Sequence, residues 1–592
     1  MQNYKTSDVS WYYLEDVRKK KIANSVWIPL RRCESLEYGD INREGFWSIF
    51  SGTGSLAVPL TRRDEGEHLT WMDIGLAHFQ RPYAFDNSYK SVDCFQQSDE
   101  DDLGIELVLV QSFCDNVFPE WHLNQDIIFA LDLRREGDVW IRPEEDYIDV
   151  VRLKRNELGK CIELQMRADH LKDYLCARRM SLRVSTYFSR CAIFKEELHF
   201  KNVQGFPYRA ELDGGRFELR RSKVNAEGMP VGAETMIMHV KRTDFSLSED
   251  VPVLGPETDD NVVVSTILKR AVGDVLYRYE GEFWRDEWLE PAPQSPRVKN
   301  DKVLSNCFFY IDADGTKESS DSLNSEDVGR WLWFKPEVAL ALLDRRGVTL
   351  KWYTRNTGAI SPTPGFSVHF GINELGLINV YAFDIAKLPE WLRRFWVGYN
   401  VPPEGGVCSE LIAAQVEATP AETHACETHF KEALEALDEV FIQRWGRPLF
   451  LPHNDVKQII GKVLRFRACI NDGILSLAKD IARLTVDRID IKFLKEVSTS
   501  SVEEGSRSIK VLGRVLEGFG PPEDVRRLLS PLVGVYELRL GDAHLASSKI
   551  GEAYYLVGID SSASNLEKAF QMIDRVSSCL DNITDFISKI DS

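Results

Sequence analysis

The sequence lacks the short motifs and segments that would assign a membrane anchor, a secreted fold or a nucleotide cofactor. It contains no run of about 18 apolar residues, so no transmembrane helix is expected. Its first residues, Met1–Lys5, contain no apolar segment of the kind that secretion signals need. None of its 11 cysteines forms a C-x-x-C pair, so we expect free thiols in a reducing cytoplasm. No P-loop or G-x-G-x-x-G fingerprint occurs, so no cofactor is predicted.

Basic residues are fewer than acidic ones. The chain has 73 lysines and arginines against 92 aspartates and glutamates, a formal net charge of −19. Broad, nonspecific binding to nucleic acid is therefore disfavoured, because that binding comes from neutralising phosphates. Residues 428–592 are nearly neutral, however, so the acidic excess lies upstream and leaves room for a local basic cleft in this last part.

The chain does have the length and apolar content for several hydrophobic cores. Its 592 residues exceed what one domain usually holds, and 43% of them are hydrophobic. Stretches rich in Pro, Asp, Ser and Gly over 244–262 and 289–300 are typical of connections. We predict a multidomain α+β protein with an N-terminal α+β domain over 1–250, a central β-containing domain over 251–410, a linker over 411–427 and a helical domain over 428–592.

Alternation of apolar and polar residues predicts the strands of the first domain. We expect strands over 45–50 and 55–60 joined by a turn at 52–54, a strand over 125–133 and a helix over 168–177. Further strands are expected over 25–30, 103–112, 138–141, 147–153, 160–166 and 181–187.

In the central domain, the same alternation predicts an antiparallel sheet from 348–355, 365–371 and 376–383. A Trp-rich amphipathic helix is expected over 388–397, and another helix over 261–270.

From residue 428 onward the apolar spacing is helical. The first helix has one apolar face, made by Phe430, Leu434, Leu437 and Phe441. One long helix is expected over 456–484 and a shorter one over 506–517. From Leu566 the apolar residues recur at alternating steps of three and four, a heptad pattern that requires a partner helix within a bundle or across a dimer.

One helix near the end of the sequence is expected to begin at Ser530-Pro531, because Ser is a good N-cap and Pro is tolerated in the first turn. Leu532, Tyr536 and Arg539 then fall on one face. Arg539 is thus expected on the buried stripe, where a guanidinium needs a partner, a cavity or an interface.

The spacing Arg539-x4-His544 resembles the signature of the HEPN superfamily, which carries Arg-x4–6-His on a late helix of a small helical bundle. Many members are metal-independent ribonucleases that act as dimers. The resemblance implies attack of an RNA 2′-hydroxyl on the adjacent phosphorus, with His544 moving a proton and Arg539 binding the phosphate. Asp542 would orient these groups. Leu540 departs from the family pattern, which often has Asn, Asp or His there.

On an ideal helix, Arg539 and His544 point roughly 140° apart. Two copies related by a two-fold axis would build a composite cleft, as the family does. The resemblance therefore implies a homodimer through the helical domain, with RNA as the substrate.

A polar residue on the preceding helix often points at the Arg/His pair in this family. Arg467 interrupts the apolar face of the helix expected over 456–484, and Asn471 and Asp472 follow one turn later, so these three residues could support the site. Alternatively, Arg467 pairs with a buried carboxylate such as Glu537 or Asp542.

His424, Cys426 and His429 form a compact cluster of residues that can bind zinc. No second ligand pair lies nearby in the sequence, so a metal site is disfavoured and none is assigned.

The sequence thus predicts a cytoplasmic endoribonuclease of the HEPN type, acting as a regulated effector in anti-phage defence or a toxin system. Its upstream domains would sense a phage-derived or protein trigger. The competing interpretation, favoured by Leu540 and the acidic charge, is a non-catalytic HEPN assembly module in a sensor or adaptor protein.

Overall fold

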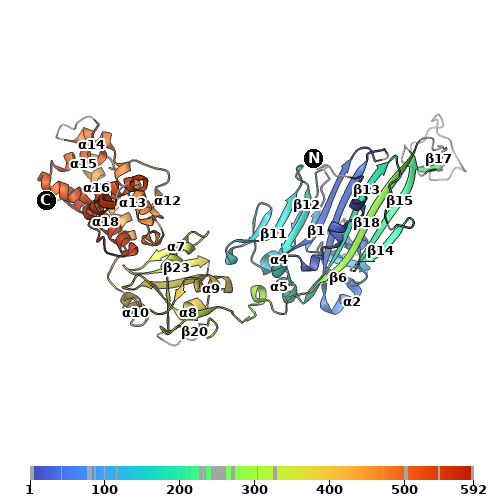
Figure 1. Ribbon diagram of the computed structural model, residues 1–592, viewed down its shortest axis with the longest axis horizontal. Helices are drawn as coiled ribbons and strands as arrows, with labels where there is room; N and C mark the ends of the chain where they lie inside the picture. Colours follow the sequence, from blue (N-terminus) through green and yellow to red (C-terminus); the bar gives the residue numbers. More distant parts are fainter. Residues whose placement is uncertain are drawn as a thin grey trace. The chain divides into compact units, whose positions relative to one another are not determined.

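The computed structural model describes residues 6–588 with gaps. The gaps are 42, 77–82, 86–87, 99–100, 115–116, 202, 213, 226–230, 232–234, 242–261, 269–273, 303, 324–329, 364, 420, 471, 499–504 and 545–546. Only the backbone is described at 83–85, 88, 90, 96–98, 101, 212, 235–241, 262–268, 541–544 and 547–548. Two compact units make up the chain: Met1–Pro143 with Tyr147–Val303, and Glu144–Asp146 with Leu304–Ser592 (Figure 1). The predicted α+β class is confirmed, with strands dominating the first unit and helices ending the second.

A single antiparallel sheet forms the frame of the first unit, in the order β14-β15-β18-β13-β2-β1-β12-β11-β10-β9 (Figure 1). Its strands are β1 (Trp27–Tyr38), β2 (Trp47–Pro59), β9 (Arg134–Glu136), β10 (Val139–Arg142), β11 (Ile148–Arg155), β12 (Cys161–Arg167), β13 (Met180–Phe194), β14 (Tyr208–Leu212), β15 (Gly215–Asn225) and β18 (Val275–Leu289). Because β18 pairs with β13 along its whole length, the first unit extends to residue 303, past the boundary of 250 predicted from composition.

The turn predicted at 52–54 is wrong, because β2 runs straight through Gly52 and Gly54. Both glycines lie in the strand where the short helix α3 (Trp71–Ile74) crosses it closely. A Cβ atom at Gly52 would overlap the Trp71 ring, and one at Gly54 would overlap the Ile74 carbonyl. Close approach of two backbones, not a reversal of the chain, is what requires glycine here.

Two other local predictions for the first unit fail. Residues 125–133, predicted as a strand, contain the helix α4 (Gln125–Ala130), which the Asn124 side chain caps by accepting from the amide of Asp126. Residues 261–270, predicted as a helix, contain the strand β17 (Val262–Leu268), which pairs with β16 (Thr235–Lys241). The predicted helix over 168–177 is confirmed as α5 (Ala168–Arg178), and it packs with α4 on β1 and β12.

A six-stranded antiparallel sheet begins the second unit, in the order β22-β23-β24-β25-β21-β26. Its strands are β21 (Trp331–Phe334), β22 (Thr349–Trp352), β23 (Thr357–Thr363), β24 (Phe366–Ile372), β25 (Ile378–Tyr381) and β26 (Asn400–Val401). The antiparallel sheet was predicted, although β21 and β23 were not. The amphipathic helix expected over 388–397 is confirmed as α9 (Glu390–Val397), with Leu392 and Trp396 buried.

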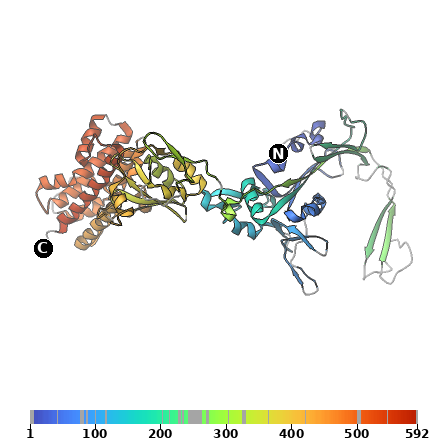
Figure 2. The ribbon, with the colours of Figure 1, turned by 90° about the horizontal axis from the view of Figure 1, so that it is seen from below.

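The remaining helices, orange to red in Figure 2, gather into a bundle. They are α11 (Cys426–Trp445), α12 (Val456–Ile460), η5 (Arg465–Cys469), α13 (Gly473–Leu484), η6 (Val486–Arg488), α14 (Ile491–Val497), α15 (Ser508–Leu516), α16 (Pro522–His544), α17 (Ser547–Val557) and α18 (Asn565–Ser588). The predicted apolar face of α11 is buried, and so is the heptad pattern of α18. The partner of α18 lies within the bundle, since α18 packs on α11 and α16. Among the described residues, no helix has the length and apolar character needed to cross a membrane.

Two predicted helix boundaries in the bundle are wrong. The long helix expected over 456–484 is broken into α12, η5 and α13. The break before α13 occurs at Asp472, which has a left-handed φ of 59°. Gly473 is required beside it, since a Cβ atom there would overlap the Arg467 carbonyl. The helix expected to begin at Ser530-Pro531 begins instead at Pro522 and continues through Pro531, where the Ser530 hydroxyl donates to the Leu556 carbonyl.

A buried ion pair lies where the bundle meets the six-stranded sheet. Arg465 is 2% exposed and donates to both carboxylate oxygens of Glu427, at 2.9 and 2.7 Å. The Arg465 guanidinium lies 4.5 Å from the centre of the Trp352 ring on β22 and 4.8 Å from that of Phe570 on α18. The next residue, Phe466, is fully buried in the core of the sheet and stacks on Trp352. The sheet and the bundle therefore share one core.

We predict that Gly54→Ala destabilises the protein by about 1–3 kcal/mol, because the added methyl group must displace the backbone of α3. Urea unfolding measures this change. Gly205→Ala is the matched control, since a Cβ atom there meets nothing within 4 Å. A Gly54→Ala protein as stable as the control would show that α3 does not hold this position in solution.

We also predict that Glu427→Gln lowers the free energy of unfolding by about 3–5 kcal/mol, because it leaves the Arg465 charge buried without its counterion. Burial alone would raise the pKa of Glu427, but the Arg465 guanidinium lowers it. The stabilisation is therefore present above the ordinary carboxyl pKa and is lost as pH falls through the lowered value. Glu435→Gln, at an exposed carboxylate 3.9 Å from Lys431, should change stability by less than about 0.5 kcal/mol. Equal effects of the two substitutions would contradict the role given to Glu427.

Candidate functional site

Arg539 lies at the edge of the buried face of α16, not on it. The buried residues of this part of the helix are Leu532, Val535 and Leu538, while Leu540 is 44% exposed. The expectation that Arg539 lies on the buried stripe is therefore wrong: its side chain is one-third exposed. The reason is that Val535 and Leu538 lie at the centre of the buried face of α16, whereas Tyr536 and Arg539 lie at its edge.

Among the described side chains, one carboxylate holds the Arg539 guanidinium. Its Nη1 donates to Asp487 of η6, whose side chain is 30% exposed. The guanidinium also lies 5.8 Å from the centre of the Tyr536 ring, one turn earlier on α16. The helix α13 packs along α16, and η6 follows α13 directly, so Asp487 of η6 lies beside Arg539. Arg539 is thus oriented but remains accessible to solvent.

The other two residues of the predicted motif, Asp542 and His544, belong to the last turn of α16. Their side chains lie outside the described part of the structure, and so does Asn471. The backbone places His544 five residues after Arg539 on one helix, as the sequence predicted.

Arg467 makes a different ion pair from the two that were predicted. It donates to Asp480 of α13 and, at 2.5 Å, to the Ser476 hydroxyl, while the Asp542 side chain lies outside the described part of the structure. Both members of this pair are mostly buried, with side chains 19% and 10% exposed. Arg467 lies on η5 and not on a continuous apolar helix, so its contacts tie η5 to α13.

Asp472, the other residue predicted to support the site, is exposed at the N-terminus of α13 and makes no capping hydrogen bond there. The contacts of Arg467 and Arg539 run to different carboxylates, Asp480 and Asp487, which are seven residues apart on α13 and η6. The described contacts therefore give Arg539 one positioning partner, Asp487, that the sequence did not suggest.

Cys426 and His429 of the possible zinc cluster have separate surroundings, and His424 is exposed. Cys426 is buried beside Glu427 and Arg465, and the His429 Nε2 lies 2.5 Å from Asp581 on α18. Within the described ranges, no group of three or more His, Cys, Asp or Glu side chains could hold a metal ion.

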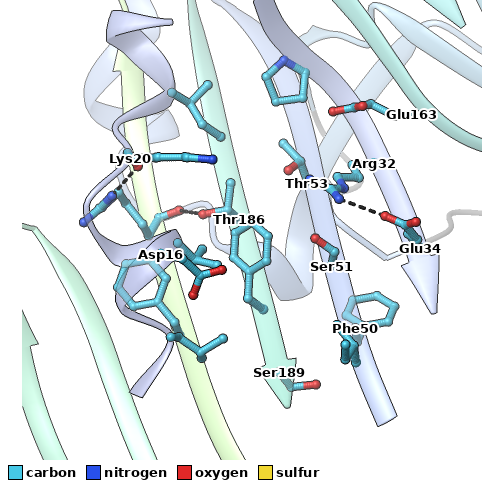
Figure 3. A pocket seen from close by; sticks show the side chains of 18 of the residues that line it. Asp16, Lys20, Arg32, Glu34, Phe50, Ser51, Thr53, Glu163, Thr186 and Ser189 are labelled. Atoms are coloured by element: carbon cyan, nitrogen blue, oxygen red, sulfur yellow. Dashed lines mark hydrogen bonds and ion pairs between the residues drawn. The ribbon is translucent and has the colours of Figure 1, made fainter. Parts of the chain in front are cut away.

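A trough of about 650 Å³ lies on one face of the large sheet of the first unit (Figure 3). Its floor is formed by β1, β2, β13 and β18, and one of its walls is the N-terminal segment that contains α1 (Glu15–Arg18) and η2 (Ile22–Asn24). No motif in the sequence marks this trough, because its residues come from five separate segments of the chain.

Strand register aligns the polar side chains of the floor. Glu163, Arg32, Thr53, Thr186 and Arg285 are direct neighbours, in this order, on β12, β1, β2, β13 and β18. Adjacent strands are about 4.8 Å apart, so these residues form one polar row across the sheet. Only the pairing of the strands could have identified them as a site.

We predict that the two ion pairs of the bundle differ in their contribution to stability. Asp487→Asn should change the free energy of unfolding by about 1 kcal/mol or less, because the pair with Arg539 is near the surface. Asp480→Asn should cost about 3 kcal/mol or more, since it leaves Arg467 without its counterion in a mostly buried place. Chemical unfolding of both variants gives the comparison. If Asp487→Asn lowers the free energy of unfolding as much as Asp480→Asn does, the pair between Arg539 and Asp487 is too strong for a ligand to replace.

No model of a known protein family matches the chain, and neither a curated protein nor a solved structure matches it.

Proposed function

We propose that the helical part of the second unit is a HEPN-type endoribonuclease with Arg539 and His544 as its functional pair. The observation that carries the proposal is the state of Arg539. Its guanidinium lies at the margin of the bundle, one-third exposed, on the same helix as His544, and among the described side chains Asp487 is the carboxylate that holds it. Such a pair contributes little to stability, so an RNA phosphate can replace Asp487 as the partner of Arg539.

In this proposal the chemistry needs a cation for the phosphate and a group that transfers a proton. Arg539 would hold two phosphate oxygens through its planar fork and stabilise the charge that develops on the phosphorane. His544 would remove the proton of the 2′-hydroxyl or donate one to the leaving 5′-oxygen, because the pKa of imidazole is close to neutral pH. Asp542 would orient His544. The near neutrality of residues 428–592 permits this local contact with RNA despite the net charge of −19.

Two features favour a second function, a non-catalytic assembly module. Arg539 already has a carboxylate partner, and Leu540 beside it is 44% exposed. An exposed apolar side chain next to the motif is suited to contact with a second copy of the chain or with an adaptor. In both functions we propose that the upstream part of the chain is the regulatory part, responding to a phage-derived or protein trigger.

The two functions are separated by His544→Ala. For the nuclease, we predict that this substitution lowers RNA cleavage by about 100-fold or more, since general acid–base catalysis typically contributes that much. Arg539→Ala should abolish cleavage at least as strongly. Cleavage by the wild type should persist in EDTA, because the 2′-hydroxyl is the nucleophile. The measurements are RNA integrity in cells that express each variant, before and after phage infection, and cleavage of RNA by the purified proteins.

His453→Ala is the matched control, because His453 is an exposed histidine of the same bundle that contacts Asp455. Cleavage by wild type and His453→Ala, without cleavage by His544→Ala, supports the nuclease. Equal cleavage by all three removes the assignment. If wild type and His544→Ala protect cells equally without RNA cleavage, the assembly module is the better function.

A further inference from the structure

Two arginines fasten the N-terminal segment to the sheet and thereby form one wall of the trough. Arg285, 4% exposed, donates to the Lys20 carbonyl at 2.7 Å. Arg190 donates to the Trp11 carbonyl at 2.9 Å and to Asp16 at 2.7 Å. Both guanidiniums are thus engaged in holding the wall in place and are not the groups that would meet a ligand.

The carboxylates of the trough are also engaged. Asp16 pairs with Arg190, Glu34 with Arg32 at 2.8 Å, and Glu163 with Lys154 at 2.5 Å. Glu287 accepts the amide hydrogen of Ile22 at 3.0 Å. Each acidic group of the trough therefore has a cation or an N–H donor beside it, which leaves no carboxylate to attract a cationic ligand.

The spare donors of the trough are cationic or hydroxylic. Lys20 is exposed and makes no ion pair with any described residue, and its side chain extends from the wall toward Thr53 and Arg32 (Figure 3). Arg32 uses only its Nη2 in the pair with Glu34. The hydroxyls of Ser51 and Thr53, on the floor between them, have no hydrogen-bond partner in the described part of the chain. Ammonium, guanidinium and hydroxyl groups together suit an oxyanion.

One aromatic ring of the trough has no stacked ring or cation on its face among the described residues. Phe283 lies under the Arg285 guanidinium, Trp27 under that of Arg152, and Phe50 packs against Trp71. Phe188, half-buried, lies opposite Phe283 in the register of β13 and β18 and packs at the margin of the core around Phe283, but no stacked ring or cation covers its face among the described residues. It lies opposite Ser51 in the register of β13 and β2, one row below Thr53. A ring of a ligand can pack on Phe188 while an oxyanion reaches Thr53.

We propose that this trough binds a small molecule that carries a planar ring and one oxyanion, either a phosphate ester or a carboxylate. The ring packs on Phe188, and the oxyanion lies between Lys20 and Arg32 and accepts from Ser51 and Thr53. A volume of about 650 Å³ is that of a pocket for a ligand of this size. This site lies in the first unit and is independent of the nuclease proposed for the bundle.

The test is isothermal titration of the full-length protein with four probes. Adenosine 5′-monophosphate carries the ring and a phosphate, and phenylacetate carries a ring and a carboxylate. Adenosine lacks the oxyanion, and ribose 5-phosphate lacks the ring. We expect at least one of the first two to bind more tightly than adenosine and ribose 5-phosphate. Binding of the monophosphate alone identifies a phosphate ester, and binding of phenylacetate alone identifies a carboxylate.

Three variants test the residues. Lys20→Gln should weaken binding by about tenfold or more, because it removes a charge-assisted contact. Lys21→Gln, the neighbouring lysine that does not line the trough, should not weaken it. Phe188→Leu should weaken the ring-bearing probe and leave ribose 5-phosphate unchanged. Glu34→Gln frees Arg32 and removes a negative charge, so it should tighten binding, a result that misfolding cannot produce.

The proposal is overturned if no probe binds the wild type. It is also overturned if adenosine binds as tightly as its monophosphate while phenylacetate does not bind. A third contradicting result is equal affinity of Lys20→Gln and Lys21→Gln for the oxyanion probe. The proposal is also overturned if Glu34→Gln, folded as judged by an unchanged unfolding midpoint, binds the oxyanion no more tightly than the wild type.

Discussion

The structure of the second unit depends on the buried ion pair between Arg465 and Glu427. Removing two charges from water is costly, and the cost is offset here by two direct hydrogen bonds and a third from the Arg465 amide to the same carboxylate. The flat guanidinium is also enclosed by Trp352 and Phe570. With Arg465 fixed, Phe466 enters the core of the six-stranded sheet and Arg467 turns toward α13. Three consecutive residues thus join the sheet to the bundle. The segment that follows α13 contains Asp487, which accepts a hydrogen bond from Arg539. These contacts connect the six-stranded sheet to Arg539.

Strand register plays the corresponding part in the first unit. The side chains of β12, β1, β2, β13 and β18 are far apart in the sequence, but antiparallel pairing places them in rows across one face. The N-terminal segment then closes one side of that face, because Arg190 and Arg285 hold its carbonyl groups. The floor of the trough is therefore formed by the frame of the sheet, which fixes the relative positions of Arg32, Ser51, Thr53 and Phe188, while Lys20 comes from the N-terminal wall.

The sequence predicted the elements whose pattern is local. The apolar faces of α11 and α18 and the position of α5 follow from helical periodicity alone. The failures involve contacts between distant segments. Gly52 and Gly54 have the sequence pattern of a turn, but they are required because α3 crosses the strand there. Gly473 is required because the Arg467 carbonyl lies against it. Pro531 resembles a helix start, although the helix begins at Pro522. For the candidate site, the spacing of Arg539 and His544 was visible in the sequence, whereas the partner of Arg539 was not, because Asp487 is 52 residues away. The trough has no sequence pattern at all.

Native-state hydrogen exchange of the full chain, followed by mass spectrometry across a series of denaturant concentrations, tests most directly whether the sheet and the bundle of the second unit are one body. The shared core around Arg465 and Phe466 predicts that peptides from β22–β24 and peptides from α11 lose their protection together, with the same opening free energy. Loss of protection in the sheet while α11 stays protected would contradict the single core, and with it the proposed connection from the sheet to Arg539.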